Sequence, residues 1–354
     1  MAKKLFDFAI GNPPYQEEFS TDGNKTYAAP VYNDFMDAAN DVADKVELIH
    51  PARFLFNAGS TPKAWNEKML NDPHFKILRY EADASKVFPN TSINGGVAVS
   101  YHNSEENYGA IEIFCKFNEM NSILQKVFKR ADFNSMEEIV VTRTAFHLTD
   151  KMHADFPDAI NRLSKGHAYD MSSNIFERIP NVFNESKPTD GHNYIRIYGR
   201  LGTMRTYRYI RKDYVNDVSN LYSYKVITAA ADGAAGQIGQ PIPARIMGKP
   251  MVAEPGVGYT ESFISIGTFK TIKEANALEK YVRTKFARTM LGILKVTQHI
   301  TPIKWKYVPL QDFTDKSDLD WSKSIHEIDL QLYRKYGLSV EEINFIETHV
   351  KEMI

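Results

Sequence analysis

The residues of this chain best suited to chemistry are Asn12, Pro13, Pro14 and Tyr15, which follow a short apolar run at residues 5–10. The amino group of adenine is a poor nucleophile, because its lone pair is delocalised into the ring. A site that accepts both amino hydrogens helps the nitrogen to become tetrahedral. The side-chain oxygen of Asn12 and the backbone oxygen of Pro13 could accept them. Two successive prolines fix φ at about −65° and remove two N–H donors, so the loop is rigid and rich in acceptors.

Tyr15 adds an aromatic face to this loop, on which an extruded base could stack. No general base with a shifted pKa is needed, because the alkylated product sheds its proton easily. The pattern therefore predicts transfer of an alkyl group to a planar nitrogen. Asn-Pro and Pro-Pro also mark ordinary turns, so a turn without chemistry is the alternative.

Strand-like and helix-like patterns alternate around this loop. The strand-like runs lie at residues 5–10, 46–49, 77–80, 96–101 and 110–115, and helical spacing occurs at 31–42, 61–70 and 118–130. Thr61 is placed to cap the second helix, with Pro62 at its first position. This alternation predicts an open α/β sheet. Since no helix separates the last two runs, that edge of the sheet is expected to be antiparallel.

Changes of composition along the chain predict three domains. Residues 1–150 would form the α/β catalytic region. Residues from about 150 to 270 are rich in Gly, Pro, Tyr and Arg, and residues 151–315 are predicted to form an irregular α+β domain that recognises the target. Residues 316–354 would form C-terminal helices, with Gly337 ending one helix and Ser339 starting the next. Helical spacing returns at 273–295, 322–336 and 340–351.

The net charge of −1 and the single cysteine limit the kinds of protein this chain can be. Any nucleic-acid surface must be a local patch, because the chain is no polycation. Cys115 alone excludes an intramolecular disulfide and a cysteine-based zinc cluster, and its apolar neighbours predict a buried thiol. The histidines show no metal spacing, so no metal site is expected. Without a signal peptide or an apolar stretch of about 18 residues, a cytoplasmic protein without membrane contact is expected.

A basic segment at residues 194–214 holds five interleaved tyrosines and one acid, Asp213. Its basic residues are Arg196, Arg200, Arg205, Arg208, Arg211 and Lys212. In two strands that turn at Gly199 and Gly202, this segment could place arginines on phosphates or guanine edges of double-stranded DNA. A solvated basic hairpin is the alternative. A small-residue loop at 229–239 is interpreted as a flexible connection, with a mobile segment that orders on DNA as the alternative.

Several stretches resemble the Eco57I-type restriction-modification methylases, a family of adenine-N6 DNA methyltransferases. They are residues 6–16, 51–63, 86–100, 285–298 and 305–313, and the resemblance covers essentially the whole chain. It implies a partial methyltransferase (Rossmann-like) sheet that transfers a methyl group from S-adenosylmethionine to N6 of an adenine flipped out of DNA. By the same resemblance, Phe88 would hold the flipped base opposite Tyr15. A core position for Phe88 is the alternative, because phenylalanine is often buried.

The cofactor-binding half of such an enzyme is missing from its expected place. In the family, a Gly-rich turn and an acidic residue for S-adenosylmethionine precede the Asn-Pro-Pro-Tyr strand, whereas only eleven residues precede Asn12. A permuted arrangement would use residues 252–258, with Glu254, Gly256 and Gly258. However, a strand-like run follows, whereas a cofactor-binding turn should open a helix. We therefore expect a partner subunit that carries the cofactor half, with a truncated product or an inactive remnant as alternatives.

Three other functions stay open. A restriction endonuclease would hold Mg²⁺ on an acid followed by Glu-x-Lys, and Asp158 with Glu185 and Lys187 has that form. Glu185, however, lies in a polar, loop-like run. A non-catalytic DNA-binding specificity subunit would borrow the active site of a partner. Methylation of RNA or protein would also suit Asn-Pro-Pro-Tyr, which serves planar amide and amine nitrogens generally.

Overall fold

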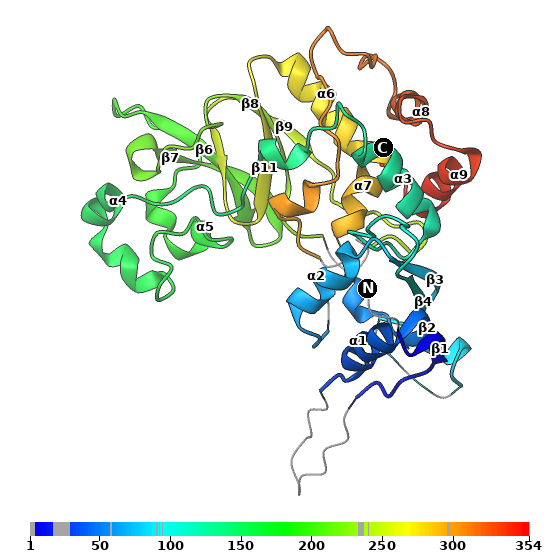
Figure 1. Ribbon diagram of the computed structural model, residues 1–354. Helices are drawn as coiled ribbons and strands as arrows, with labels where there is room; N and C mark the ends of the chain where they lie inside the picture. Colours follow the sequence, from blue (N-terminus) through cyan, green and yellow to red (C-terminus); the bar gives the residue numbers. More distant parts are fainter. Residues whose placement is uncertain are drawn as a thin grey trace, which may run out of the picture. The chain divides into compact units, whose positions relative to one another are not determined.

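The computed structural model describes residues 4–16, 29–56, 59–89, 91, 93, 95–232, 237–239, 241–295 and 298–353. It divides into two compact units, Met1–Asn121 and Ser122–Ile354, called here the N-terminal and the C-terminal unit. Both combine helices with small sheets, so the predicted α/β class is confirmed in this coarse form (Figure 1). The partial methyltransferase sheet stays a prediction. Within the described ranges, no helix is long and apolar enough to cross a bilayer.

A four-stranded sheet forms the centre of the N-terminal unit. Its strands are β1 (Phe6–Gly11), β2 (Ala43–Pro51), β3 (Phe75–Glu81) and β4 (Val97–Asn103), in the order β1-β2-β4-β3. β1 and β2 run parallel, with Ala9 opposite Val46, and the other two pairs are antiparallel. Four of the five predicted strands are confirmed. One edge of the sheet is antiparallel, as predicted, but it is formed by β3 beside β4 and not by residues 110–115.

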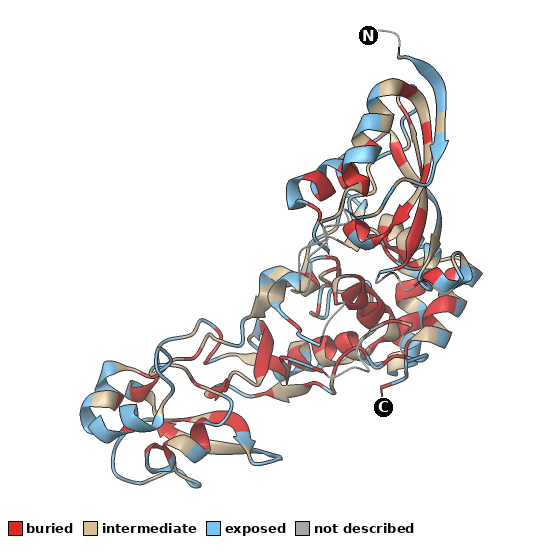
Figure 2. Cartoon of the chain, turned by 90° about the horizontal axis from the view of Figure 1, so that it is seen from below, coloured by how far each residue is buried: buried red, intermediate tan, exposed pale blue. Residues whose placement is uncertain are grey.

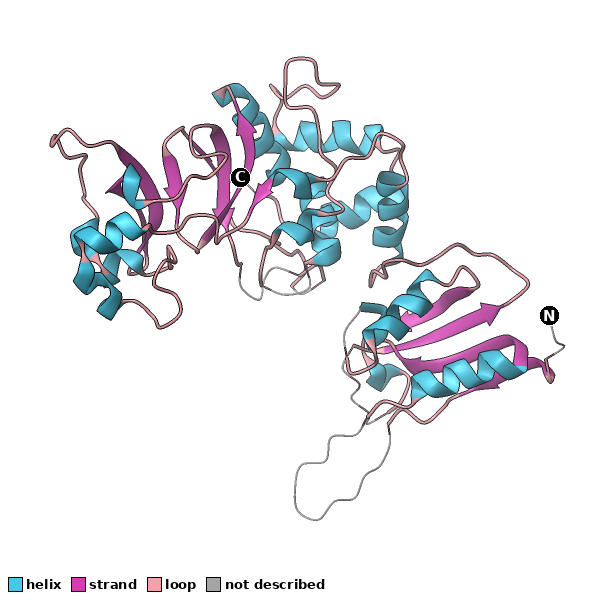
Figure 3. Cartoon of the chain, turned by 60° about the vertical axis from the view of Figure 1, so that its left-hand side comes forward, coloured by secondary structure: helices cyan, strands magenta, loops and turns pink. Residues whose placement is uncertain are grey.

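Two helices, α1 (Tyr32–Val42) and α2 (Lys63–Asn71), cover one face of this sheet (Figure 3). They share one buried cluster with β2, which includes Tyr32, Met36, Val46, Leu48, Trp65 and Met69. The predicted cap of α2 is wrong, because Pro62 occupies the N-cap position. The hydroxyl of Thr61 instead donates to the side-chain oxygen of Asn66 at 2.7 Å.

Residues 110–115 do not form the predicted strand. Glu112 has a φ of 54°, a left-handed conformation that interrupts an extended chain. Its N–H donates to a carbonyl of α2 at 2.8 Å, while Ile111 and Phe114 pack on the core cluster. The apolar residues therefore serve packing rather than strand pairing. Cys115 is buried as predicted, and burial raises its pKa to about 12.

Strand β1 is exposed although its sequence is apolar. Phe6, Phe8 and Ile10 are 58%, 63% and 79% exposed, and Figure 2 shows the strand beside the N-terminus largely in pale blue. Within β1 only Ala9 packs on the core cluster. In the described part of the chain β1 pairs with β2 alone, so its second edge is free. β1 thus combines exposed apolar side chains with an unpaired edge.

The C-terminal unit holds two small sheets. β6 (Tyr194–Leu201) and β7 (Met204–Arg211) form an antiparallel hairpin, and β10 (Val257–Tyr259) joins β6 in parallel. The second sheet is antiparallel and has the order β5-β11-β8-β9. Its strands are β5 (Val140–Val141), β8 (Tyr224–Ala229), β9 (Met251–Ala253) and β11 (Phe263–Phe269).

The longer helices lie near the positions that the sequence predicts. They are α3 (Asn118–Phe128), α6 (Ile272–Arg283), α7 (Lys285–Leu294), α8 (Ile325–Lys335) and α9 (Val340–His349), beside the short α4 (Asp150–Asp155) and α5 (Ile175–Arg178). Ser339 caps α9, and Gly337 follows α8 with a φ of 60°. The single helix predicted at 273–295 is wrong. Thr284 leaves the helical conformation there, and its hydroxyl accepts the N–H of Ala287.

Helix α8 is tied to α7 within the C-terminal unit. The carboxylate of Asp329 accepts the N–H groups of Lys285 and Phe286 at 2.9 and 2.8 Å. The boundary between the two compact units lies between Asn121 and Ser122 in the chain. Helices α8 and α9 belong to the C-terminal unit, together with its two sheets. The functional division at residues 150 and 315 stays a prediction. Residues 233–236 of the predicted flexible connection lie outside the described residues.

Candidate functional site

The motif Asn12–Tyr15 begins directly after β1, at the carboxyl end of the parallel pair β1–β2. Ligands of open α/β sheets bind outside the carboxyl ends of such strands. Asn12 and Pro14 are exposed and Pro13 is half-buried. The side-chain amide of Asn12 has no hydrogen-bond partner among the described residues, so its oxygen is available to a ligand.

Tyr15 is held by its backbone and by its ring. Its carbonyl accepts the N–H of Val31 at 3.2 Å, just before α1. The half-buried ring packs against the core cluster of the N-terminal unit. Its hydroxyl is buried without a hydrogen-bond partner in the described part of the chain, and burial raises its pKa. The hydroxyl therefore makes no hydrogen bond to the described residues, whereas the ring is held in place by its contacts with the core cluster.

Phe88 reaches the same place from a different part of the chain. It follows a 3₁₀ turn at Ala84–Lys86, and its N–H donates to the carbonyl of Ala84 at 2.8 Å. The rings of Tyr15 and Phe88 lie with centroids 6.4 Å apart and planes inclined by 68°. Phe88 is half-buried rather than in the core. The structure thus brings together the two aromatic residues that the sequence predicts for one base.

The end of β2 adds two residues that the sequence prediction missed. His50 is fully buried, with Nε2 2.8 Å from Ser100 Oγ and Nδ1 3.1 Å from the carbonyl oxygen of Pro51. Burial lowers its pKa to about 4, so the ring is neutral and structural. Arg53 is exposed and packs against Gly95, where a Cβ would lie 2.5 Å from its Cγ. In the sequence, the position of Arg53 shortly after a predicted strand could have indicated a cation at this end of the sheet.

The predicted DNA-binding segment forms the β6–β7 hairpin of the C-terminal unit. Four of its six cations have acidic partners at 2.5 to 2.8 Å: Arg196 with Glu254, Arg208 with Glu185, Arg211 with Asp213, and Lys212 with Asp217. Such partly exposed pairs stabilise the fold only modestly, but they neutralise charge. Arg200 and Arg205 have no acidic partner among the described residues.

The turn of this hairpin corrects one sequence prediction. Gly202 does lie in the turn, with a φ of 59°. Gly199 instead lies inside β6, where a Cβ would come within 2.6 Å of the Phe176 ring and 2.8 Å of Thr260. Gly199 is therefore required by close packing, and its prediction as a turn residue is wrong.

The permuted cofactor candidate at residues 252–258 forms a tight turn between two strands. Glu254 is engaged by Arg196, and Gly256 takes a φ of 81° in the turn. A Cβ on Gly258 would lie 2.8 Å from Ile197 and 2.9 Å from Phe146. Both glycines thus have a packing or turn role, and the turn leads into β10 rather than into a helix that could hold a cofactor. These residues do not fit S-adenosylmethionine.

The nuclease pattern is not assembled either. Asp158 lies in a 3₁₀ turn at Pro157–Arg162, while the side chain of Glu185 pairs with Arg208 at 2.8 Å. In the described ranges, no three His, Cys, Asp or Glu side chains group as metal ligands would. The acids of the pattern therefore have separate places in the fold.

A comparison with protein families concerns the same part of the chain. Residues 1–88 match the model of the Eco57I restriction-modification methylase family. The predicted family is thereby confirmed for the segment that contains Asn12–Tyr15 and Phe88. The matched segment includes β1 to β3 and ends before β4.

Two individual proteins are similar to this chain. An uncharacterized adenine-specific methylase of Mycoplasma pneumoniae is 28% identical over 143 residues, which cover 38% of this chain and 33% of that relative. The matched segment thus spans a third of the relative's length. The type IIG restriction endonuclease BpuSI is 10% identical with a TM-score of 0.34, over 96% of this chain and 52% of that structure. A TM-score of this size does not indicate a shared fold.

Proposed function

We propose that this chain provides the adenine-binding half of a site-specific DNA methyltransferase from a restriction-modification system. The methyl group of S-adenosylmethionine would be transferred to N6 of an adenine flipped out of double-stranded DNA. The observation that carries the proposal is the contact between Tyr15 and Phe88 beside Asn12, at the carboxyl end of β1. Two aromatic rings and two oxygen acceptors at one strand end suit a flat base with an exocyclic amino group.

The residues of this chain would act on the base alone. The side-chain oxygen of Asn12 and the backbone oxygen of Pro13 would accept the two amino hydrogens of adenine. This draws the nitrogen lone pair out of the ring, so that N6 can attack the methyl carbon. The proton that N6 then loses can pass to water. Tyr15 and Phe88 would hold the ring, while S-adenosylmethionine would supply the methyl group as an electrophile. Its S–CH3 bond would break as the N–C bond forms, and the thioether S-adenosylhomocysteine would leave with the bonding electrons.

The cofactor half is proposed to lie on a partner that docks on β1. Parallel strands are ordinarily buried on both faces, yet Phe8 and Ile10 are more than half exposed. An unpaired, apolar edge is a template for a further strand. We therefore assign β1 to a sheet that continues in the cofactor-binding half, which would add a strand beside β1 and cover Phe6, Phe8 and Ile10. S-adenosylmethionine would bind to that half, next to Asn12.

The β6–β7 hairpin is proposed to hold the DNA duplex. The motif on β1 needs a bound duplex from which to extrude a base, and the hairpin has a dense set of cations for this. The proposed contacts include Arg196, Arg200, Arg205, Arg208, Arg211 and Lys212. The four that are paired with acids would have to exchange these partners for phosphates, whereas Arg200 and Arg205 would not.

Calorimetric titration with S-adenosylmethionine tests this proposal, first on the chain alone and then with the product of the neighbouring upstream reading frame. We expect binding only when both are present, together with methylation of adenine in duplex DNA. Binding by the chain alone would refute the need for a partner. DNA binding without methylation by the complex would favour a non-catalytic specificity subunit, and DNA cleavage would favour an endonuclease.

A further inference from the structure

Two arginines face each other at the end of the β6–β7 hairpin. Arg200 and Arg205 are direct cross-strand partners in the register of the ladder. Like charges in directly opposite positions destabilise a strand pair unless something compensates them. Arg200 Nη2 donates only to the carbonyl of Gly202, at 3.3 Å, and Arg205 lies over the Phe263 ring at 5.5 Å. Among the described residues neither arginine forms an ion pair, although the carboxylate of Glu177 accepts the N–H of Gly202 in the same turn at 2.6 Å.

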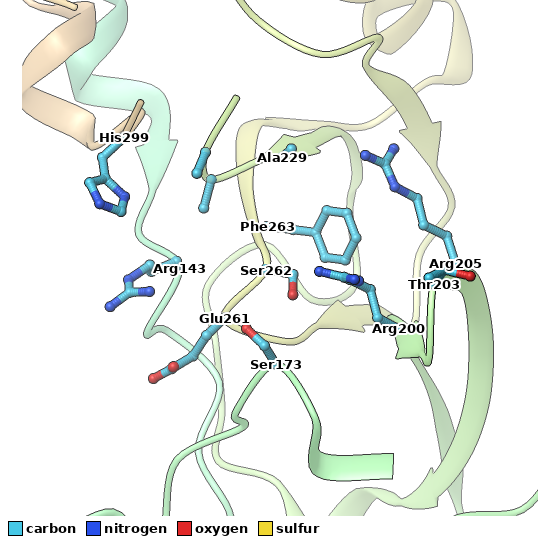
Figure 4. Close-up of a pocket in the computed structure, with 12 residues that line it drawn as sticks. Arg143, Ser173, Arg200, Thr203, Arg205, Ala229, Glu261, Ser262, Phe263 and His299 are labelled. Atoms are coloured by element: carbon cyan, nitrogen blue, oxygen red, sulfur yellow. The ribbon is translucent and has the colours of Figure 1, made fainter. Parts of the chain in front are cut away.

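A third arginine reaches the same place from outside the hairpin. Arg143 and His299 line a pocket of about 370 Å³ together with Arg200 and Arg205. All lining residues belong to the C-terminal unit. In Figure 4, Arg143 and His299 lie on one side of the pocket and the hairpin arginines on the other, with Ser262 and Phe263 between them.

The charge in this pocket is not balanced by the chain itself. Arg143, like the two hairpin arginines, forms no ion pair with a described residue. Glu261 is the one acid among the lining residues, and in Figure 4 its carboxylate points away from Arg200 and Arg205. The remaining polar groups are the hydroxyls of Ser173, Thr203 and Ser262, which can donate hydrogen bonds. The three arginines and three hydroxyls of the lining favour an anion, Glu261 opposes one, and the alanines and Phe263 are apolar.

We infer that this pocket binds a phosphate group of the DNA backbone. The inference rests on the proposed function, which makes DNA the substrate, and it adds Arg143 and His299 to the interface. A base edge is neutral and is satisfied by one bidentate arginine, so it would leave the charge of this pocket unbalanced. A phosphate offers oxygens to several guanidinium groups at once and compensates their repulsion. The four acid-paired cations of the hairpin need no such compensation, because their charge is already neutralised by acids of the chain.

Such a pocket would position the protein on DNA and would not recognise the base sequence. Phosphate contacts fix the register of a protein on DNA and carry no sequence information. The loss of such a contact should weaken binding equally for all sequences and reduce its dependence on salt. The loss of a base contact should instead weaken binding to one sequence only. These two signatures separate a phosphate pocket from a base-reading pocket.

The test measures binding of the full chain to fluorescent duplexes of several sequences over a series of KCl concentrations. The double variant Arg143→Gln/Arg205→Gln should bind every duplex at least about 10-fold more weakly, and the slope of log K against log salt should become shallower by roughly one, as expected for the loss of one phosphate contact. Arg162→Gln, an exposed arginine without an ion pair to a described residue, is the charge control and should keep its slope. Arg143→Lys/Arg205→Lys should keep the slope with a smaller loss, which shows that folding is intact.

Each other result has a distinct meaning. An unchanged slope in the double Gln variant would overturn the inference while the wild-type chain still binds DNA. A loss confined to one sequence would overturn it in favour of base reading. Failure of the wild-type chain to bind any duplex would instead overturn the proposed function, and the inference with it. Inorganic phosphate, titrated at constant ionic strength, should displace DNA only at millimolar or higher concentration. Displacement at micromolar concentration would reassign the pocket to a free anion.

Discussion

The rings of Tyr15 and Phe88 meet edge to face, with centroids 6.4 Å apart and planes inclined by 68°. A base stacked between two rings needs about 3.5 Å on either side, and thus parallel rings about 7 Å apart. The distance between the two ring centroids is nearly large enough for a base, but the ring planes are far from parallel. One ring has to turn before a base can enter, and the two rings cover each other until then. Without a base, this contact keeps apolar surface from water at the end of β1.

Tyr15→Ala should reduce adenine methylation by the complete enzyme roughly 10- to 100-fold, because it removes one stacking face worth about 1–3 kcal/mol. Tyr15→Phe is the matched control, since the hydroxyl has no partner in the described part of the chain and the ring is kept. We expect that variant to stay within about twofold of wild type. Fluorescence of 2-aminopurine at the target position would report extrusion of the base directly. A larger loss with Phe than with Ala would contradict the stacking role.

Asn12→Ala should lower the methylation rate at least about 100-fold while DNA affinity stays within a few fold, because it deletes an acceptor used as charge develops on N6. Asn12→Asp keeps an acceptor oxygen and should retain more activity than Ala. Single-turnover methylation and a separate duplex-binding assay measure the two quantities. Unchanged methylation in Asn12→Ala would exclude the proposed role of this side chain.

Phe8→Asp or Ile10→Lys should prevent association with the cofactor-binding half, since each puts a charge on the apolar strand proposed to be covered. Neither side chain is buried in this chain, so its own fold should persist. Leu78→Lys is the control, because Leu78 is 50% exposed on β3, at the opposite end of the sheet order. Calorimetry of the two halves measures the association. Equal affinity for the β1 variants and the control would mean that β1 is not the interface.

Local patterns were sufficient for most elements of the fold. Helix α1 and the four strands of the first sheet follow from the spacing of apolar residues, and Ser339 and Gly337 mark helix ends by their own chemistry. The prediction failed at residues 110–115, where apolar residues pack on α2 around the left-handed Glu112. It failed again at Thr284, which ends α6 and caps α7 although the apolar spacing continues through it.

The functional surfaces were predictable to different degrees. Asn12–Tyr15 stands out because four adjacent residues form the pattern, but the meeting of Tyr15 with Phe88 followed only from a family resemblance. The basic hairpin was visible in the sequence. Which of its cations have acidic partners was not, since three of the four pairing acids lie outside the segment. Arg143 was missed because long-range folding alone brings it to Arg200 and Arg205.

His50 should make the N-terminal unit sensitive to acid. Its ring is buried against Tyr32, Phe54 and Ser100, and burial lowers its pKa from 6.5 to about 4. Between these two values the unfolded chain binds a proton that the folded chain does not. The free energy of unfolding should therefore be highest above pH 6.5 and fall by about 3 kcal/mol as the pH drops to 4.

Hydrogen exchange in β2 and β4, corrected for the intrinsic rate at each pH, measures this change in the N-terminal unit. The variant His50→Gln should be less stable at pH 7, because it loses the fit to Ser100, but it should lack the histidine-dependent decline between pH 6.5 and 4. His326→Gln, at an exposed position in α8, should behave as wild type. An equally steep decline in His50→Gln and wild type would assign the acid sensitivity to carboxylates instead, since these also titrate near pH 4.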